Sequence, residues 1–210
     1  MKPKAISFDM DETLVEPQLV DKFWFEEVPK LYADKNDLEF EAAVDFVKEK
    51  YDEIGPEKVR WYQPEYWFER FDLEGDPSEV IKNNSYEVRI YPDALEILED
   101  LYGDYELMVI SNASQIFLDV QLDSIKGYFS RIFSCVSDFG KVKKNREVYE
   151  EICSLVGMEP EDLVHVGNDR KFDYEVPREI GIRAFLIDRE GNDRADGEIL
   201  RDLREIKGEL

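Results

Sequence analysis

From residue 91 onward, short apolar runs alternate with amphipathic stretches, and this rhythm restricts the fold more than any other feature of the chain. Together with one earlier run, the apolar runs predict strands at AISFD (5–9), ELMVIS (106–111), RIFSCVS (131–137), DLVHVG (162–167) and RAFLID (183–188). The stretches between and after them predict helices at PDALEILEDLYG, SQIFLDVQLDSIKGYF, NREVYEEICSLVG, residues 171–180 and GEILRDLREIKG (197–208). Because strands that alternate with helices form a parallel sheet covered on both faces, the sequence predicts a doubly wound, Rossmann-like α/β fold.

Residues 16–87 interrupt this rhythm with helical patterns and no clear strand. In NDLEFEAAVDFVKEKYDEIG, an apolar face predicts a helix, and Asn36 with Glu39 forms a plausible capping pair at its start. The face consists of Phe40, Val44, Val47, Tyr51 and Ile54. PEYWFERFDL (64–73) predicts another short helix. We therefore expect an α/β core domain of residues 1–15 and 88–210, and a small helical cap domain of residues 16–87 inserted after the first strand.

Composition and charge exclude several classes of partner. With 43% hydrophobic residues in 210, the chain has enough apolar side chains for a globular core. Its 50 acids and 27 bases give a net charge of -23, a field that repels nucleic acid and anionic membranes. The two cysteines form no CxxC motif, and no apolar run is long enough for a signal peptide or a membrane span. We expect a soluble, cytoplasmic protein with reduced thiols.

Polar residues stand at the carboxyl ends of the predicted strands, which is where parallel sheets bind their ligands. These residues are Asp9 and Asp11, Ser111 and Asn112, Asn168 and Asp169, and, in the loop after the third strand, Lys141, Lys143 and Lys144. Separately, the two acids are also compatible with helix capping, Ser111 and Asn112 with a turn, and the lysines with a solvated loop. Together at one edge they predict a site, and the repulsion between Asp9 and Asp11 calls for a cation such as Mg²⁺.

Four segments in order resemble the motifs of the haloacid dehalogenase-like (HAD) hydrolases. FDMDETL is similar to the first motif, an apolar strand followed by DxDGT, and VISNAS (109–114) to the second, a strand that ends in Ser or Thr. SDFGKVKKNREVY (137–149) resembles the lysine motif, and VHVGNDRKFDYEVPREIGI (164–182) the acidic fourth motif. The resemblance covers most of the chain, although residues 16–87 match only as the position of a helical cap.

The resemblance implies phosphoryl transfer through an aspartyl-phosphate. Asp9 would be the nucleophile, and Asp11 would protonate the leaving alcohol and then activate water. Mg²⁺ would be bound by the Asp9 side chain and the Asp11 carbonyl. Ser111 and Asn112 would bind phosphate oxygens, and Lys143 would neutralise phosphate charge and restrain Asp9. Thr13 would stabilise the geometry of the loop.

Three residues depart from the family pattern. Glu12 replaces the usual glycine, which is tolerable if the backbone there has an ordinary φ, and Lys144 replaces the usual proline. Asn168 stands where the family has its metal-binding acid, so the fourth-motif ligand is either the amide oxygen of Asn168 or the carboxylate of Asp169, with Asp173 in support. We favour Asp169, because carboxylate is the better ligand for a hard dication.

We therefore expect a Mg²⁺-dependent phosphatase that acts on a small phosphorylated metabolite. A phosphomutase would use the same residues, and a binding or regulatory module that has lost catalysis is the alternative that the three departures suggest. We expect His165, the only histidine, to be a hydrogen-bonded core residue rather than a catalytic one. The sequence predicts neither the particular phosphomonoester, nor the cap aromatics that contact it, nor the oligomeric state.

Overall fold

A single six-stranded sheet organises the core of the computed structural model, which describes residues 2–143, 145–191 and 198–210. Its strands run parallel in the order β3-β2-β1-β4-β5-β6. Their bounds are β1 Ala5–Phe8, β2 Glu106–Ser111, β3 Arg131–Ser134, β4 Leu163–Gly167, β5 Arg183–Ile187 and β6 Ile199–Leu200. The reversal of strand order on either side of β1 is that of a doubly wound sheet, so the predicted fold class is confirmed.

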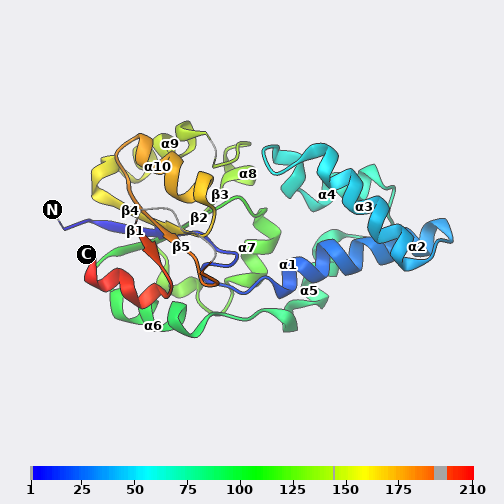
Figure 1. Ribbon diagram of the computed structural model, residues 1–210, viewed down its shortest axis with the longest axis horizontal. Helices are drawn as coiled ribbons and strands as arrows, with labels where there is room; N and C mark the ends of the chain where they lie inside the picture. Colours follow the sequence, from blue (N-terminus) through cyan, green and yellow to red (C-terminus); the bar gives the residue numbers. More distant parts are fainter. Residues whose placement is uncertain (1, 144, 192–197) are drawn as a thin grey trace.

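Helices cover both faces of the sheet, as the alternating side chains of β2 require. Leu107 and Val109 pack in the cluster that contains residues of α6 and α7, whereas Met108 and Ile110 pack in the cluster that contains residues of α9. The helices of the core are α6 Pro92–Leu101, α7 Gln115–Gln121, α8 Cys135–Asp138, α9 Arg146–Val156 and α10 Val176–Glu179. Figure 1 shows α9 and α10 on one face and α6 on the other. A parallel sheet buried on both faces follows.

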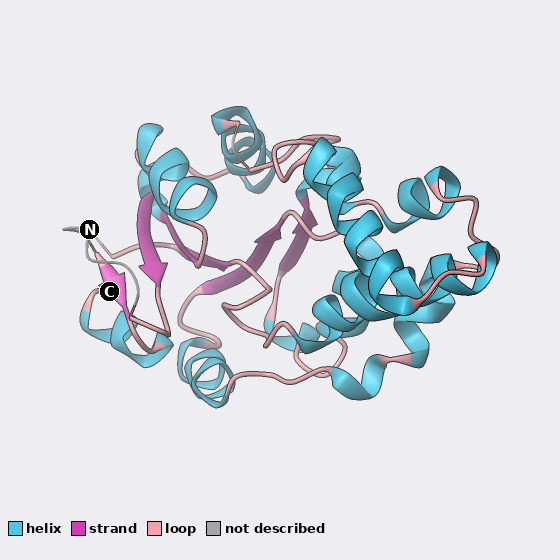
Figure 2. Cartoon of the chain, turned by 45° about the vertical axis from the view of Figure 1, so that its right-hand side comes forward, coloured by secondary structure: helices cyan, strands magenta, loops and turns pink. Residues whose placement is uncertain are grey.

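Residues 16–87 form a helical lobe beside the sheet (Figure 2). A turn of π-helix over Phe23–Glu27 joins its first two helices. The helices of the lobe are α1 Gln18–Lys22, α2 Val28–Asn36, α3 Phe40–Ile54, α4 Pro64–Arg70 and α5 Pro77–Asn83. The predicted helical character of this segment, including the helix over 64–73, is therefore confirmed.

The start of the longest lobe helix was predicted wrongly. Asn36 is the last residue of α2, the chain turns at Asp37 with a left-handed φ of 52°, and Glu39 is the N-cap of α3. Asn36 donates its side-chain amide back to the Tyr32 carbonyl of its own helix. Phe40 is 42% exposed, so the buried face of α3 begins at Ala43 and continues through Val47 and Tyr51, as predicted for the last two.

Three elements of the core also differ from prediction, and one is the helix predicted over SQIFLDVQLDSIKGYF, whose α-helical part, α7, ends at Gln121. The strand at 131–137 ends at Ser134, whose hydroxyl accepts from the Ser137 amide and starts the short helix α8. The predicted closing helix at 197–208 is instead β6 followed by a 3₁₀ segment over Leu203–Gly208, and Gly197 lies outside the described residues. An amphipathic pattern is compatible with either structure, and here the edge of β5 provides hydrogen-bond partners for residues 198–200.

The strand register sets the position of the site. Phe8, the last residue of β1, pairs with Val109 of β2 and Val166 of β4, so Asp9 emerges beside the carboxyl ends of both neighbours. Both cysteines, Cys135 and Cys153, are buried free thiols as expected. None of the helices formed by the described residues has the length and apolar character that crossing a membrane requires.

Candidate active site

Asp9 lies at the edge of the sheet and is bound to Lys143. Its carboxylate Oδ1 is 2.6 Å from the Lys143 Nζ, and both residues are buried. The ammonium also donates to Asp173 Oδ1 at 2.5 Å and to the Ile110 carbonyl at 3.2 Å. The Lys143 amide donates to Asn112 Oδ1 at 2.8 Å, which fixes the loop that carries the lysine. The structure thus brings Asp9, Asn112 and Lys143 together as the sequence predicts, while Lys144 lies outside the described residues.

A second layer of buried polar groups supports this network. Asp173 is fully buried, and its Oδ1 lies 3.2 Å from His165 Nε2, whose Nδ1 is 2.8 Å from the Ser7 hydroxyl. The Asp173 side chain passes so close to Gly167 that a Cβ there would meet its carboxyl carbon at 2.4 Å, so only glycine fits. His165 is therefore the hydrogen-bonded core residue that was expected. It contacts Asp173, which in turn accepts a hydrogen bond from Lys143.

The charges of this network determine its protonation. Burial opposes ionisation of Asp173, but the Lys143 ammonium and His165 lower the pKa of Asp173 to about 2. Burial acts against the charged form of Lys143 as well, yet the two carboxylates that flank it raise its pKa. Burial raises the pKa of Asp9, and Lys143 opposes that shift. One ammonium is shared by two buried carboxylates, which leaves this edge of the sheet short of positive charge.

Asp11 occupies a different environment. Its Oδ1 accepts a 2.7 Å hydrogen bond from Nε2 of Gln121, a fully buried residue at the end of α7. Burial, then the Asp9 carboxylate, then Glu12, raise the pKa of Asp11 to about 8. A carboxyl group with this pKa holds a proton at neutral pH and can donate it. Gln121 gives no sequence signal, because its role depends on the packing of α7 over the loop after β1.

Ser111 and Asn112 end β2 next to Asp9. Ser111 is buried, and its hydroxyl accepts from the Ala113 amide at 3.2 Å. The Asn112 amide group is 3.4 Å from the hydroxyl of Tyr62, a residue of the helical lobe. The strand end therefore contacts the lysine loop on one side and the lobe on the other.

The two candidate metal ligands of the fourth motif, Asn168 and Asp169, make different hydrogen bonds. Asp169 caps the next helical segment, with Oδ1 accepting from the amides of Lys171 and Phe172, so Oδ2 takes no part in the cap bonds. Asn168 donates through Nδ2 to Glu12 Oε2 at 2.7 Å, which leaves its amide oxygen outside that bond. Each residue thus retains one side-chain oxygen for another partner.

Glu12 does not have the ordinary backbone that we expected at its position. Its φ is 56°, in the left-handed region that glycine adopts most easily, so the side chain is accommodated with strain. Arg189, which follows β5, stabilises this loop by donating to the carbonyls of Glu12 and Thr13 while pairing with both oxygens of Asp93. The buried Thr13 hydroxyl has no hydrogen-bond partner among the described residues, so Arg189 holds the loop that Thr13 was expected to stabilise. No motif marks Arg189 in the sequence.

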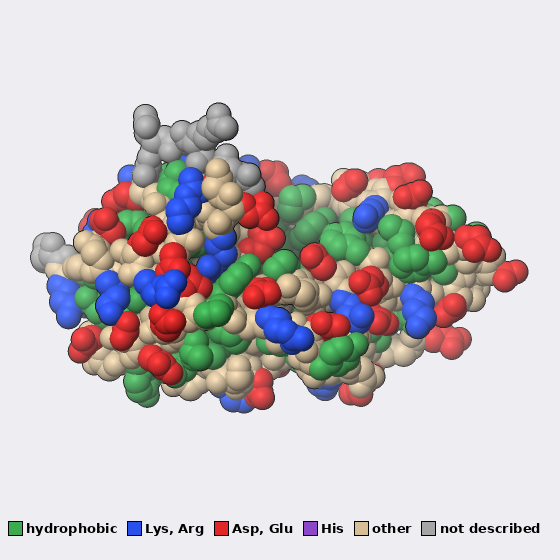
Figure 3. All heavy atoms as spheres, turned by 60° about the horizontal axis from the view of Figure 1, so that its bottom comes forward, with side chains coloured by type: hydrophobic (Ala, Val, Ile, Leu, Met, Phe, Trp, Pro, Cys, Tyr) green, Lys and Arg blue, Asp and Glu red, His purple; other side chains and the backbone are tan. Residues whose placement is uncertain are grey.

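A cavity of about 320 Å³ opens above these residues, between the core and the helical lobe. The core side of the cavity is lined by all the expected site residues: Asp9, Asp11, Ser111, Asn112, Lys143, Asn168 and Asp169. Figure 3 shows acidic side chains spread over the surface of both the core and the lobe, with lysines and arginines between them. The expected site residues therefore share one cavity in a protein of strongly negative charge.

The family model of the haloacid dehalogenase-like hydrolases matches residues 3–181. The chain belongs to this family of hydrolases. This HAD-like hydrolase is 22% identical over 185 residues to the GMP/IMP nucleotidase YrfG of Escherichia coli, covering 87% of the chain and 81% of that protein. The match thus spans most of both proteins.

Solved structures share the fold of this HAD-like hydrolase. A HAD phosphatase from Thermococcus onnurineus superimposes with a TM-score of 0.87 at 22% identity, covering 99% of this chain and 97% of that one. The putative HAD hydrolase YfnB of Bacillus subtilis, described as bound to magnesium, gives a TM-score of 0.70 at 15% identity, with coverage of 100% and 99%.

The donor set of this HAD-like hydrolase is compatible with Mg²⁺. The described residues hold no group of three or more His, Cys, Asp or Glu side chains arranged as a metal cluster. Mg²⁺ does not require one, because it retains several waters and commonly takes one or two carboxylates. Asp9, Asp169, the Asn168 amide oxygen and the Asp11 carbonyl could supply the protein ligands, and the excess of carboxylate over ammonium here favours a cation.

Proposed function

We propose that the protein is a Mg²⁺-dependent phosphomonoester hydrolase that acts on a small phosphorylated metabolite through an aspartyl-phosphate on Asp9. The observation that carries the proposal is the difference between two acids that are two residues apart. Burial raises the pKa of both acids, but the Lys143 ammonium at 2.6 Å opposes that shift at Asp9, whereas the pKa of Asp11 reaches about 8. The aspartyl-phosphate route uses an ionised carboxylate as nucleophile and a protonated carboxyl group as acid, and these two side chains can fill the two roles.

The chemistry divides between these residues in two steps. In the first, a carboxylate oxygen of Asp9 attacks phosphorus, the bond from phosphorus to the alcohol oxygen breaks, and Asp11 gives its proton to that oxygen. In the second, water attacks the phosphorus of the acyl phosphate while Asp11 takes a proton from it, which releases phosphate and restores Asp9. Lys143 restrains Asp9 and neutralises phosphate charge, and Ser111 and Asn112 bind phosphate oxygens at the end of β2.

Mg²⁺ would neutralise the negative charge of the phosphate oxygens during transfer. Asp9, the Asp11 carbonyl, and either Asp169 or Asn168 would hold it. We retain Asp169 as the preferred ligand because its charge suits a hard dication, and its Oδ2 takes no part in the cap bonds. The magnesium described for the Bacillus subtilis neighbour supports this choice of metal.

Residues 16–87 would act as a cap domain over the core formed by residues 1–15 and 88–210. The lobe contacts the core at the site through Tyr62 and Asn112. In the fourth-motif segment, the Lys171 ammonium donates to Glu57 of the lobe at 2.7 Å. A cap in this position would exclude bulk water and large substrates during transfer. The nucleotidase relative, which covers 87% of this chain, supports a small phosphorylated metabolite as the substrate.

Release of inorganic phosphate from p-nitrophenyl phosphate tests this proposal. We expect turnover with Mg²⁺, loss of turnover with EDTA, and no activity in Asp9→Asn. If the wild type matches Asp9→Asn on a broad panel of phosphomonoesters with Mg²⁺ present, the chain is a binding module instead. A phosphomutase would rearrange a substrate and release little phosphate, so measuring phosphate separates it from a phosphatase.

The fourth-motif ligand is tested by comparing Asn168→Ala with Asp169→Ala. Titration of activity with Mg²⁺ should give a metal affinity that falls more than tenfold in Asp169→Ala and less in Asn168→Ala. Unchanged Mg²⁺ affinity in Asp169→Ala would assign the ligand to Asn168. Helix content, measured by circular dichroism, controls for loss of the Asp169 cap.

A further inference from the structure

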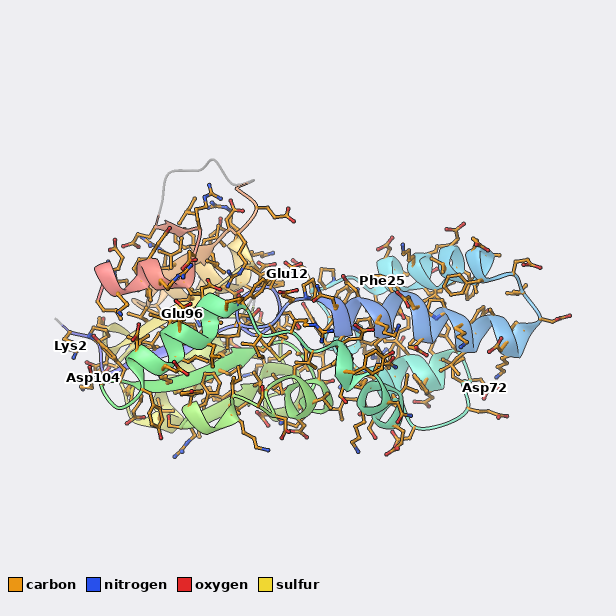
Figure 4. The ribbon with its side chains drawn as sticks, turned by 90° about the horizontal axis from the view of Figure 1, so that it is seen from below. Lys2, Glu12, Phe25, Asp72, Glu96 and Asp104 are labelled. Atoms are coloured by element: carbon orange, nitrogen blue, oxygen red, sulfur yellow. The ribbon has the colours of Figure 1, made fainter. Side chains whose placement is uncertain are left out.

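The lobe side of the cavity is built from large apolar side chains. Trp24 and Phe25 come from the first turn of π-helix, and Trp61 and Tyr62 from a short 3₁₀ segment between α3 and α4. Phe25 is 40% exposed although it is large and apolar, and Figure 4 shows it on the lobe near the junction with the core, where Glu12 lies. Trp24 is buried, whereas Phe25, Trp61 and Tyr62 keep part of their rings accessible, and accessible rings inside a cavity offer flat surfaces on which another ring can stack.

Charge on the lobe side is confined to one residue. Among the described residues that line the cavity, Asp21 is the only charged one that the lobe contributes. Asp21 lies on α1, one turn before Trp24, and its carboxylate makes no hydrogen bond or ion pair within the described part of the chain. Asp21 is exposed toward the cavity, and the burial that its carboxyl group does have raises its pKa. An acceptor without a partner therefore lies next to the aromatic side chains.

The cavity has no spare cation for a second anionic group. Lys143 is the only lysine or arginine among the described lining residues, and it is already paired with Asp9 and Asp173. A substrate whose alcohol part carries a carboxylate or a second phosphate would meet Asp21 without a compensating charge. The charge of the whole chain, -23, adds to the repulsion. Charge alone thus favours a leaving group that is neutral or positive.

We propose that the alcohol part of the substrate is a flat, uncharged ring system with N–H donors, as in a nucleoside monophosphate, and that Asp21 selects it. This inference rests on the proposed phosphatase function and specifies its substrate class. The ring stacks against Phe25, Trp61 or Tyr62 while its N–H groups donate to the Asp21 carboxylate. Guanine presents two adjacent N–H groups that match both oxygens of a carboxylate. A cavity of about 320 Å³ suits a ligand of this small class.

The first test compares substrates by kcat/KM with Mg²⁺. Wild type should prefer guanosine monophosphate to phosphoglycolate, whose leaving group carries a carboxylate, by about tenfold or more. In Asp21→Asn, kcat/KM for guanosine monophosphate relative to that for p-nitrophenyl phosphate should fall about tenfold. Asp34→Asn is the matched control, because Asp34 is exposed on α2 and does not line the cavity. It should leave the ratio unchanged.

The second test measures binding without turnover. Guanosine should quench tryptophan fluorescence saturably in wild type, because Trp24 and Trp61 line the cavity, and bind about tenfold more weakly to Asp21→Asn. Guanosine binding by a protein that hydrolyses no phosphomonoester would overturn the phosphatase, and with it the substrate class, and would leave the cavity as a binding site for the ring. Hydrolysis of p-nitrophenyl phosphate with no guanosine binding, or with phosphoglycolate preferred, would overturn the inference and leave the phosphatase intact.

Discussion

Different forces stabilise the carboxyl edge of the sheet and the interior of the helical lobe. At the edge, Lys143 links Asp9 and Asp173 at 2.6 and 2.5 Å, so charge and hydrogen bonding fix each side chain in one position. In the lobe, Tyr51 and Trp67 meet edge to face at 4.6 Å, and further rings surround them, so the order comes from apolar packing. A buried polar network specifies geometry and fails if one member is removed, whereas apolar packing loses stability in proportion to the volume removed.

Replacing Lys143 with methionine should give the largest effect, because it leaves two buried carboxylates without their cation. The free energy of unfolding should fall by about 3–5 kcal/mol, and phosphatase activity should be lost. Lys141→Met is the control, since Lys141 pairs with Glu151 at 3.2 Å on the surface and should cost about 1 kcal/mol or less. Urea unfolding measures the stability of both variants. Equal stability would mean that the buried network at the edge contributes no more than a surface ion pair, which would remove its contrast with the packed lobe.

Truncation of Trp67 should affect stability alone. The side chain is fully buried in the lobe, so Trp67→Ala should lower the free energy of unfolding by about 3–5 kcal/mol, while the folded protein retains its kcat on p-nitrophenyl phosphate. Tyr86→Ala, at a side chain that is 62% exposed, should change stability by about 0.5 kcal/mol or less. A loss of kcat in folded Trp67→Ala would mean that lobe packing positions the catalytic groups.

The smallest expected effect is on proton transfer. Gln121→Leu removes the 2.7 Å bond to Asp11, so kcat/KM for an alkyl phosphate, whose leaving group must be protonated, should fall about tenfold. p-Nitrophenyl phosphate has a leaving group that needs no proton and should be affected about threefold or less. Gln115→Leu is a close control, because Gln115 makes the same kind of bond to Asp119 on the exposed face of α7. Equal losses on both substrates would limit Gln121 to a structural role.

The convergence of Asp9, Asn112 and Lys143 could be predicted because parallel strands bring their carboxyl ends to one edge, whatever the details of packing. The alternation of strands and helices likewise predicted the fold class. Both predictions depend on strong local patterns and on a topology that leaves few choices. The roles assigned to the site residues remain predictions.

Residues that act through packing could not be predicted. Gln121, at the end of α7, and Arg189, in the turn after β5, contact the loop after β1 from more than one hundred residues away, and neither belongs to a motif. The left-handed φ of Glu12 was missed because the sequence cannot show that Asn168 and Arg189 hold this loop. The closing segment has a helical pattern, but the open edge of β5 decides its structure.

The central position of β1 has a consequence for biosynthesis. This strand pairs with β4, and Ser7 contacts His165 across 158 residues of chain. At ~5–20 residues per second, a ribosome makes the partner of β1 about 10–30 s after β1 itself. The contacts of the helical lobe are nearer in sequence, so this segment can gain structure while one side of β1 is still open. A nascent chain that lacks β4 also lacks Asp173, and Lys143 then has only one of its two carboxylates. Activity should thus appear only late in synthesis, after β4 and the segment behind it have left the ribosome.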